Sequence, residues 1–216
     1  MSKISEDILE QKAEFYELLS LTFMDRPSKA FSETLLKVLN EEYFPLLEYS
    51  EGLEKIKASF NKKLNLMDDS DFAEKLDAEY YDLFFDPHGI KVSPWHSSYT
   101  NREHLLFQKP DFDTKKIYLK YGYKVTNNHL PGDHIAIELD FLKRITEREI
   151  KSQAENELEK FAALQKDNAE FIEEHILTWI DDFIESLRQC KSEYYLLFAS
   201  MIKVACELDF RICTKN

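Results

Sequence analysis

The chain has little glycine and little proline, with 4 and 6 residues respectively among 216. A sandwich or barrel of many short strands needs more turns than so few of these residues can supply. Hydrophobic residues make up 44% of the chain and include 16 Phe and 11 Tyr, enough to enclose a full-sized core without disulfides or metals. The composition therefore favours one compact, mainly helical domain over residues 1–216.

Cysteine is also scarce. The three cysteines, Cys190, Cys206 and Cys213, include no C-x-x-C pair and leave an odd thiol. This pattern argues against a disulfide framework and against a zinc ribbon. We therefore expect three reduced thiols.

A long hydrophobic run is missing as well. The longest uncharged apolar run, residues 194–202, is far too short to span a bilayer. The first ten residues carry charges among their apolar positions and show no small-residue cleavage site, so they do not resemble a signal peptide. We therefore expect a cytoplasmic protein without a membrane span.

Positive charge is outnumbered by negative charge, with 28 Lys and Arg against 41 Asp and Glu and a formal net charge of −13. Such a surface repels a phosphate backbone, so we expect no nucleic-acid partner. An acidic surface suits a cationic ligand, but it is also common as a means of keeping a protein in solution. Charge alone leaves both interpretations open.

Apolar residues recur at three- and four-residue spacing along most of the chain, which is typical of helices packed on a shared core. Between residues 117 and 125 the pattern also alternates, so a short strand is an alternative to helix there. The fold class predicted is all-α, a bundle of about ten helices near residues 5–26, 28–39, 50–67, 70–83, 99–108, 113–121, 133–142, 150–164, 171–187 and 192–212.

Two segments interrupt the helical period. Pro87, Gly89 and Pro94 predict a first long loop over residues 86–98, and Pro131 with Gly132 closes a second loop over residues 122–132. Within the second loop, residues 126–132 could act as a hinge between lobes 1–125 and 130–216. A polar connection of this kind is where protomers exchange lobes, so the chain is expected to be a monomer or a domain-swapped homodimer.

The common catalytic signatures are missing: the sequence has no H-E-x-x-H, no P-loop, no G-x-G-x-x-G and no G-x-S-x-G. His134 and Glu138 lie four residues apart, a spacing that places both on one helix face. Such a pair more often forms a hydrogen bond than a metal site. We therefore expect no metal, no other cofactor and no catalytic residues.

Several stretches, taken in order, resemble the signature of the TorD/DmsD/NarJ family of redox-enzyme maturation chaperones. They are EYYDLFF at 79–85, SPWHSSY at 93–99, LPGDHIAIEL at 130–139, and an H-x-x-x-W-x-x-x-F stripe at 175–183 followed by Tyr194 and Tyr195. Two positions depart from the family pattern: His96 stands where the family commonly has an acidic residue, and so does Gly132. Both departures bear on which protein a chaperone of this kind would bind.

The resemblance implies an all-helical, TorD-like chaperone rather than an enzyme. Its partner would be the precursor of a molybdenum-cofactor oxidoreductase, bound through a twin-arginine signal peptide or another N-terminal segment until the cofactor is inserted. Such a peptide carries two arginines before an apolar run, so its receptor needs an apolar groove with carboxylates at one end.

The resemblance also suggests where the peptide binds, close to the two loops. The candidate peptide-binding residues are Asp133, His134, Trp95, Tyr99, His96 and Glu138. An exposed Asp133 carboxylate would accept two hydrogen bonds from an arginine, but the same residue could simply cap its helix. His134 could likewise be a core histidine bonded to the backbone.

Two rival functions remain at this point. One is a helical metalloenzyme that uses His134, Glu138 and histidines of the first loop. The other is an adaptor that binds a helix of a folded partner through the C-terminal apolar stripe. The sequence does not name the client enzyme.

Overall fold

In the computed structural model, residues 5–41, 44–64, 69–85, 89–100, 102–125 and 131–214 are described, and all their regular elements are helical. These residues form no strand, and the single β-type pairing among them is an isolated antiparallel bridge between Trp95 and His134. The all-α prediction is confirmed. No helix in this part of the chain is both long and apolar enough to cross a membrane.

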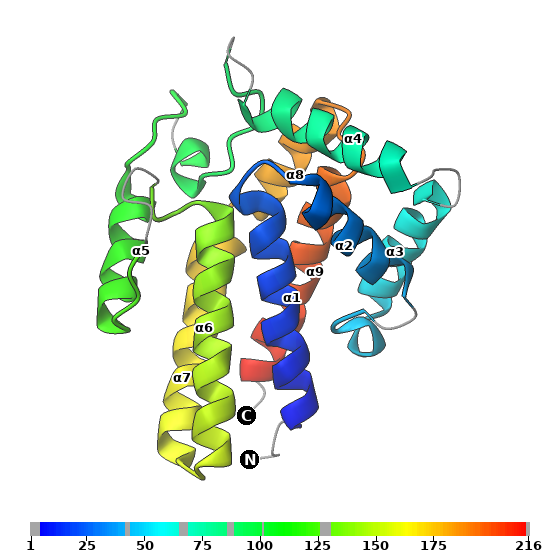
Figure 1. Cartoon of the computed structure of the whole chain (residues 1–216). Helices are drawn as coiled ribbons and strands as arrows, with labels where there is room; N and C mark the ends of the chain where they lie inside the picture. The colour runs from blue at the N-terminus through cyan, green and yellow to red at the C-terminus, as the bar shows by residue number, and fades with distance from the viewer. Residues whose placement is uncertain are drawn as a thin grey trace. The chain divides into compact units, whose positions relative to one another are not determined.

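Nine α-helices and four short 3-10 or π turns make up the described residues, where about ten helices were predicted (Figure 1). The α-helices are α1 (Glu6–Met24), α2 (Lys29–Asn40), α3 (Glu51–Leu64), α4 (Asp69–Tyr80), α5 (Lys109–Lys120), α6 (Ile135–Ala154), α7 (Leu158–Phe171), α8 (Ile180–Gln189) and α9 (Tyr195–Thr214). The short turns are η1 (Leu47–Tyr49), η2 (Tyr81–Phe85), η3 (His96–Tyr99) and η4 (Ile172–Ile176).

The chain forms two compact units, each built from separate stretches of sequence. Unit 1 comprises Met1–Met24, Pro94–Trp179 and Cys206–Asn216, and unit 2 comprises Asp25–Ser93 and Ile180–Ala205. Helix α9 contributes residues to both units. The prediction of one domain with lobes 1–125 and 130–216 stays a prediction, because residues 126–130 of the proposed hinge lie outside the described residues.

In unit 1, α6 packs against α1 along most of its length and against α7 on another side, and it runs antiparallel to both (Figure 1). The first turns of α6 are apolar nearly all round, and Ile135, Ile137 and Leu139 are all buried there. The candidate site described below is built around this buried start of α6.

A polar cluster is enclosed within unit 1. The Lys12 ammonium on α1 lies 2.6 Å from a carboxylate oxygen of Asp209 on α9 and 3.1 Å from one of Glu149 on α6, and all three side chains are at most 1% exposed. Tyr16 donates to Asp209 at 2.8 Å, and the Asn168 amide donates to both carboxylates at 3.2 Å. These bonds tie four segments of unit 1 together.

In unit 2, the carboxylate of Glu79 on α4 accepts hydrogen bonds from the backbone amides at the start of α9. One of its oxygens accepts hydrogen bonds from the Ser192 hydroxyl at 2.5 Å and from the amides of Glu193 at 3.0 Å and of Tyr194 and Tyr195 at 3.1 Å. Helix N-termini leave such amides without partners inside the helix, so Glu79 caps α9 from a distant part of the sequence.

The helix predicted over residues 99–108 is wrong. The turn η3 ends at Tyr99, and His104 and Phe107 adopt φ values of 52° and 56°, which a right-handed helix does not accept. Helix α5 begins instead at Lys109, with Pro110 in its first turn, where a missing amide hydrogen costs nothing.

Gly122 ends α5 as predicted. It adopts φ 62°, its amide donates to the Leu119 carbonyl at 3.0 Å, and the Tyr123 amide donates to the Tyr118 carbonyl at 2.8 Å. This is the Schellman pattern of helix termination. The strand considered for residues 117–125 is not formed.

Two predicted helix boundaries move. Residues assigned to a helix over 150–164 continue α6 as far as Ala154, and Asn156, with φ 59°, separates α6 from α7. The helix predicted over 171–187 is divided by the π turn η4, and α8 begins only at Ile180.

Candidate functional site

A cavity of about 600 Å³ lies in unit 1 between η3, the start of α5 and η4. One of the residues that line it, His96, is a predicted site residue. The residues that line it are His96, Thr100, Gln108, Lys109, Pro110, Asp113, Glu174, His175 and Thr178. A cleft of this size that combines polar and apolar groups is the usual form of a ligand site.

Backbone hydrogen bonds hold the first loop against the start of α6. The His96 amide donates to the Asp133 carbonyl at 3.0 Å, and the Ile135 amide donates to the Pro94 carbonyl at 2.9 Å. These two bonds bring the SPWHSSY and LPGDHIAIEL stretches together, which their separation in sequence does not reveal.

The Asp133 carboxylate faces inward, with an exposed fraction of 0%. It accepts a hydrogen bond from the Ser97 amide at 2.7 Å and another from the Ser97 hydroxyl. Burial raises the pKa of Asp133, and the bonds from Ser97 oppose that rise. The carboxylate anchors the first loop and neither lies exposed nor caps α6.

His134 is the residue that caps α6. Its Nδ1 accepts a hydrogen bond from the Ala136 amide at 3.1 Å, and burial lowers the pKa of the ring to about 3, so the imidazole is neutral at physiological pH. The ring meets that of Trp95 edge to face, with centroids 5.1 Å apart. This geometry matches a core histidine bonded to the backbone.

Glu138, His96 and His175 meet in a buried cluster. One ligand atom from each lies within 4.8 Å of the others. Burial lowers the pKa of both histidines to about 4 and raises that of Glu138 well above its ordinary value, with the Asp133 charge adding to the rise. The rival metal hypothesis joined Glu138 to His134 and to first-loop histidines; the structure joins it to His96 and to His175 of η4.

Trp95 and Tyr99 are half-buried, so neither is fully available to a ligand. The rings of Tyr99 and His96 both stack on Trp179, with centroids 5.3 Å and 5.7 Å away. Trp179 itself is 1% exposed and belongs to the core.

Residues beside the cavity that the sequence did not single out add to its character. Glu174 is exposed and forms no ion pair with the described residues, whereas Asp113 lies 3.1 Å from the Lys116 ammonium, a contact that lowers the pKa of Asp113. Phe107, just before α5, is 51% exposed, and Phe112, in the first turn of α5, is 57% exposed. These two aromatic residues close together in the sequence were the available signal for this surface.

Gly132, one of the departures from the family pattern, has a local explanation. A Cβ atom at this position would lie 3.1 Å from Lys115 Cγ and 3.2 Å from the Thr114 hydroxyl. The Gly132 amide donates to the Asp111 carboxylate at 2.5 Å, and Tyr118 donates to the Gly132 carbonyl at 2.8 Å. Close packing of α5 against this residue therefore favours glycine.

The EYYDLFF stretch lies in unit 2 and serves the fold. Glu79 caps α9 as described above, Leu83 and Phe84 are buried, and the rings of Tyr80 and Phe84 contact Tyr195 with centroids 5.8 Å and 5.1 Å away. Contacts within unit 2 therefore account for Glu79, Tyr80, Leu83 and Phe84, whereas Phe85 is 65% exposed.

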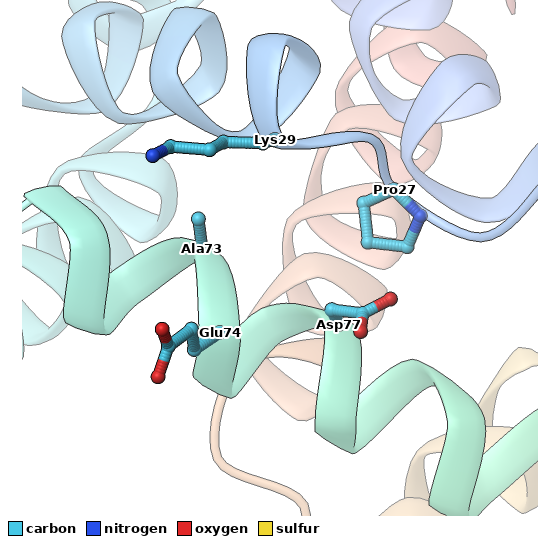
Figure 2. Close-up of a pocket in the computed structure, with 5 residues that line it drawn as sticks. All are labelled: Pro27, Lys29, Ala73, Glu74 and Asp77. Atoms are coloured by element: carbon cyan, nitrogen blue, oxygen red, sulfur yellow. The ribbon is translucent and has the colours of Figure 1, made fainter.

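A smaller cavity of about 260 Å³ lies in unit 2, between the residues that enter α2 and one face of α4 (Figure 2). Lys29 and Pro27 border it on one side and Ala73, Glu74 and Asp77 on the other. Asp77 is engaged by the Arg26 guanidinium through bonds of 2.5 and 2.6 Å. This cavity has less than half the volume of the unit 1 cavity and is lined by none of the predicted site residues, so the cavity of unit 1 is the stronger candidate.

Comparisons with known proteins bear on the family resemblance of the chain. The family model described as nitrate reductase delta subunit matches residues 47–185. Chaperone protein TorD of Vibrio atlanticus is 33% identical over 206 residues, which is 93% of each chain. The chain belongs to the TorD family of redox-enzyme maturation chaperones. The TorD of Vibrio parahaemolyticus is 29% identical over 203 residues, again 93% of each chain.

A crystal structure of a putative redox enzyme maturation protein from Archaeoglobus fulgidus has the same fold, with a TM-score of 0.52 over 96% of this chain and 94% of that one, at 21% identity. The family resemblance read from the sequence is confirmed, and so is a chaperone role in place of an enzymatic one, because the TorD relatives are chaperones.

Proposed function

We propose that this TorD-family chain acts in the cytoplasm and binds the twin-arginine signal peptide, or another N-terminal segment, of a molybdenum-cofactor oxidoreductase precursor. It holds that segment until the cofactor is inserted. The proposal rests on the family membership and on the surface around the unit 1 cavity.

The observation that carries the proposal is that two exposed aromatic residues adjoin, in the sequence, residues that line a cavity with an exposed carboxylate. Phe107 and Phe112 are more than half exposed, and their chain neighbours Gln108 and Asp113 line the cavity together with Glu174. Large exposed apolar side chains cost free energy unless a partner covers them. An arginine-bearing apolar peptide suits this surface, because its rings and chains cover the aromatics while guanidinium groups meet the carboxylates.

The peptide-binding set read from the sequence enters this proposal in two parts. His96 lines the cavity, and Trp95 and Tyr99 are half-buried residues near it in the sequence; we infer that these three contact the peptide. Asp133, His134 and Glu138 are at most 4% exposed, so we infer that they position the first loop and contact the peptide only if that loop moves. The oligomeric state, monomer or domain-swapped homodimer, stays a prediction that light scattering tests.

Peptide binding is testable with a fluorescein-labelled synthetic peptide of about 25 residues that carries two adjacent arginines before an apolar run. Fluorescence anisotropy measures its dissociation constant for the full chain. Glu174→Gln should weaken binding about 3- to 10-fold, because one charge-assisted hydrogen bond is lost. Phe112→Ser should weaken it about 10-fold or more, because apolar area is no longer buried.

Matched controls lie close at hand. Glu173→Gln changes the neighbouring exposed carboxylate, which does not line the cavity, and Leu158→Ser removes a 63% exposed apolar side chain at the start of α7. Both should leave the dissociation constant within about 2-fold, a difference under 0.5 kcal/mol. A peptide with two glutamines in place of the arginines should lose the Glu174 effect and keep the Phe112 effect. Equal effects of test and control variants would refute this surface as the peptide site.

A further inference from the structure

We propose that His96, Glu138 and His175 form a binding site for a divalent transition-metal ion of the Zn²⁺ type, next to the unit 1 cavity. The proposal is independent of peptide binding, because the chain's own side chains supply the ligands. It also goes beyond the rival enzyme hypothesis, since it assigns the ion no catalytic step.

The three side chains are brought together by three different elements. His96 begins η3, Glu138 lies in the first turn of α6, and His175 belongs to the π turn η4. The backbone bonds between the first loop and the start of α6 fix His96 beside Glu138. A π turn widens a helix locally and is often found at functional sites, and here it carries the third ligand.

The polar atoms of the cluster lack the partners that buried groups normally have. Both His175 ring nitrogens and Nδ1 of His96 are buried without a hydrogen bond to any described residue. The buried Glu138 carboxyl group is reached by the Trp179 indole, but that N–H already donates to the His175 carbonyl at 2.6 Å. Nε2 of His96 lies 3.3 Å from the Thr178 hydroxyl. Three unpartnered ring nitrogens beside a buried carboxyl group that shares its one donor are unusual for a native core, and they point to a bound group that accepts their lone pairs.

The charge of the cluster indicates a cation. Glu138 is 0% exposed, and the charged group that acts on it is Asp133, another buried carboxylate. Buried carboxylates are normally paired with a cation or bound to a metal. Lys109 on the cavity wall acts on His175, but no cationic side chain among the described residues acts on Glu138, and a divalent ion supplies that positive charge.

The distances suit a small transition-metal ion after a modest adjustment. Three atoms no more than 4.8 Å apart all lie within about 2.8 Å of a common point. Zinc bonds to imidazole nitrogen and carboxylate oxygen are about 2.0–2.2 Å long, so each side chain needs to move inward by about 0.7 Å. Two imidazoles and one carboxylate favour Zn²⁺ and its neighbours over Mg²⁺ and Ca²⁺, which prefer oxygen ligands.

The position of the cluster beside the cavity determines how an ion reaches it and what its binding would do. His96 and His175 also line the cavity, so an ion can enter from that side. Bound metal would join the first loop, α6 and η4 at one point and hold the border of the cavity in one conformation. Metal binding is therefore expected to stabilise unit 1.

The wild-type chain gives the first test. The full-length protein, stripped with a chelator and dialysed, is titrated with ZnCl₂ against a chromophoric zinc indicator. We expect one equivalent bound with a dissociation constant of about 1 μM or below, and no competition from MgCl₂. X-ray absorption spectra of the zinc-loaded chain should show two imidazole ligands and at least one oxygen ligand.

Variants locate the site. His175→Gln and Glu138→Gln each remove one ligand of three and should weaken zinc binding about 100-fold or more, since even outer-shell changes cost 10- to 100-fold. His104→Gln is the matched control, an exposed histidine that shares no contact with the cluster and should change affinity less than about 3-fold. Zinc at 100 times its dissociation constant should raise the melting temperature of the wild type and of His104→Gln by about 5 °C or more.

Circular dichroism of each variant without metal checks that it folds. If a variant fails to fold, the X-ray absorption spectrum of the zinc-loaded wild type alone decides whether these side chains bind the metal. A wild-type spectrum without two imidazoles at the zinc, or equal zinc affinity in the wild type and a folded His175→Gln or Glu138→Gln chain, overturns the proposal. In either case water, and not a metal, fills the cluster.

Discussion

Replacing Lys12 with methionine perturbs the enclosed polar cluster of unit 1 at its only cation. Methionine is close to lysine in volume, so the change removes charge more than it removes packing. Its consequence is that the carboxylates of Glu149 and Asp209, which in the wild type lie 3.1 and 2.6 Å from the ammonium, remain buried without this cationic partner.

The size of the loss in folding free energy follows from the burial of these ion pairs. Removing one partner of a buried ion pair destabilises a protein by about 3–5 kcal/mol, because an uncompensated charge is left in a poorly solvated place. For a chain of this length that loss corresponds to a fall in melting temperature of about 6–20 °C. The Tyr16 and Asn168 hydrogen bonds remain in the variant and keep the cost from rising further.

The loss should depend on pH in a definite direction. Burial raises the pKa of Glu149, and Lys12 opposes that rise, so loss of Lys12 raises the pKa further. A carboxyl group with a folded-state pKa above its unfolded value binds more protons in the folded state, so stability falls as pH rises between the two values. The variant should therefore lose more stability at pH 8 than at pH 5, by at least about 1 kcal/mol.

Urea unfolding followed by circular dichroism at pH 5 and pH 8 measures both quantities. Lys143→Met is the control, because Lys143 also joins α6 to α1, at 2.6 Å from Glu17, but this pair is at the surface with exposed fractions of 21% and 52%. Such a pair contributes about 0–1 kcal/mol. If Lys12→Met costs no more than Lys143→Met, or if its cost is the same at both pH values, the reasoning is refuted.

Two further predictions concern thiols and helix capping. Burial raises the pKa of Cys206 and Cys213, while Cys190 is only half-buried, so Ellman's reagent should react quickly with one thiol in the native chain and with all three after unfolding in guanidinium. Cys190→Ser should abolish the fast phase, and a fast phase that survives would contradict the assignment. Glu79→Ala leaves the start of α9 without its cap and should cost about 2 kcal/mol in urea unfolding, whereas Glu79→Gln keeps an acceptor and should cost about half as much. Equal costs for the two substitutions would show that the carboxylate does not act as a cap.

Most of the fold could be predicted because its signals are local. Ser28 accepts a hydrogen bond from the Phe31 amide at the start of α2, and Gly122 ends α5 in a left-handed conformation. Each signal acts within one helical turn of the residue that carries it. The helix predicted over residues 99–108 was wrong because apolar spacing does not report backbone conformation. His104 and Phe107 adopt positive φ values, and the His104 ring contacts the Ser98 carbonyl of η3 at 2.7 Å.

The candidate site was predicted less well, because burial is not a local property. Asp133 was expected to present an exposed carboxylate, yet Ser97, 36 residues away in the sequence, turns it inward. His175 and Glu174 were not proposed as site residues, since only the π turn η4 brings them to the first loop. Nothing in the spacing of the sequence reveals such a meeting.

The polar residues of the family stretches therefore divide by what they contact. Glu79 and Asp133 use their carboxylates inside the protein, on α9 and on the first loop, so their substitution should be felt first as lost stability. Groups that meet a client must instead be exposed, as Phe112 and Glu174 are, and these lie outside the EYYDLFF, SPWHSSY and LPGDHIAIEL stretches. If Phe112 and Glu174 contact the client as proposed, two relatives that share these stretches can differ in their clients, because the polar groups of the stretches are used inside units 1 and 2 while other residues meet what binds.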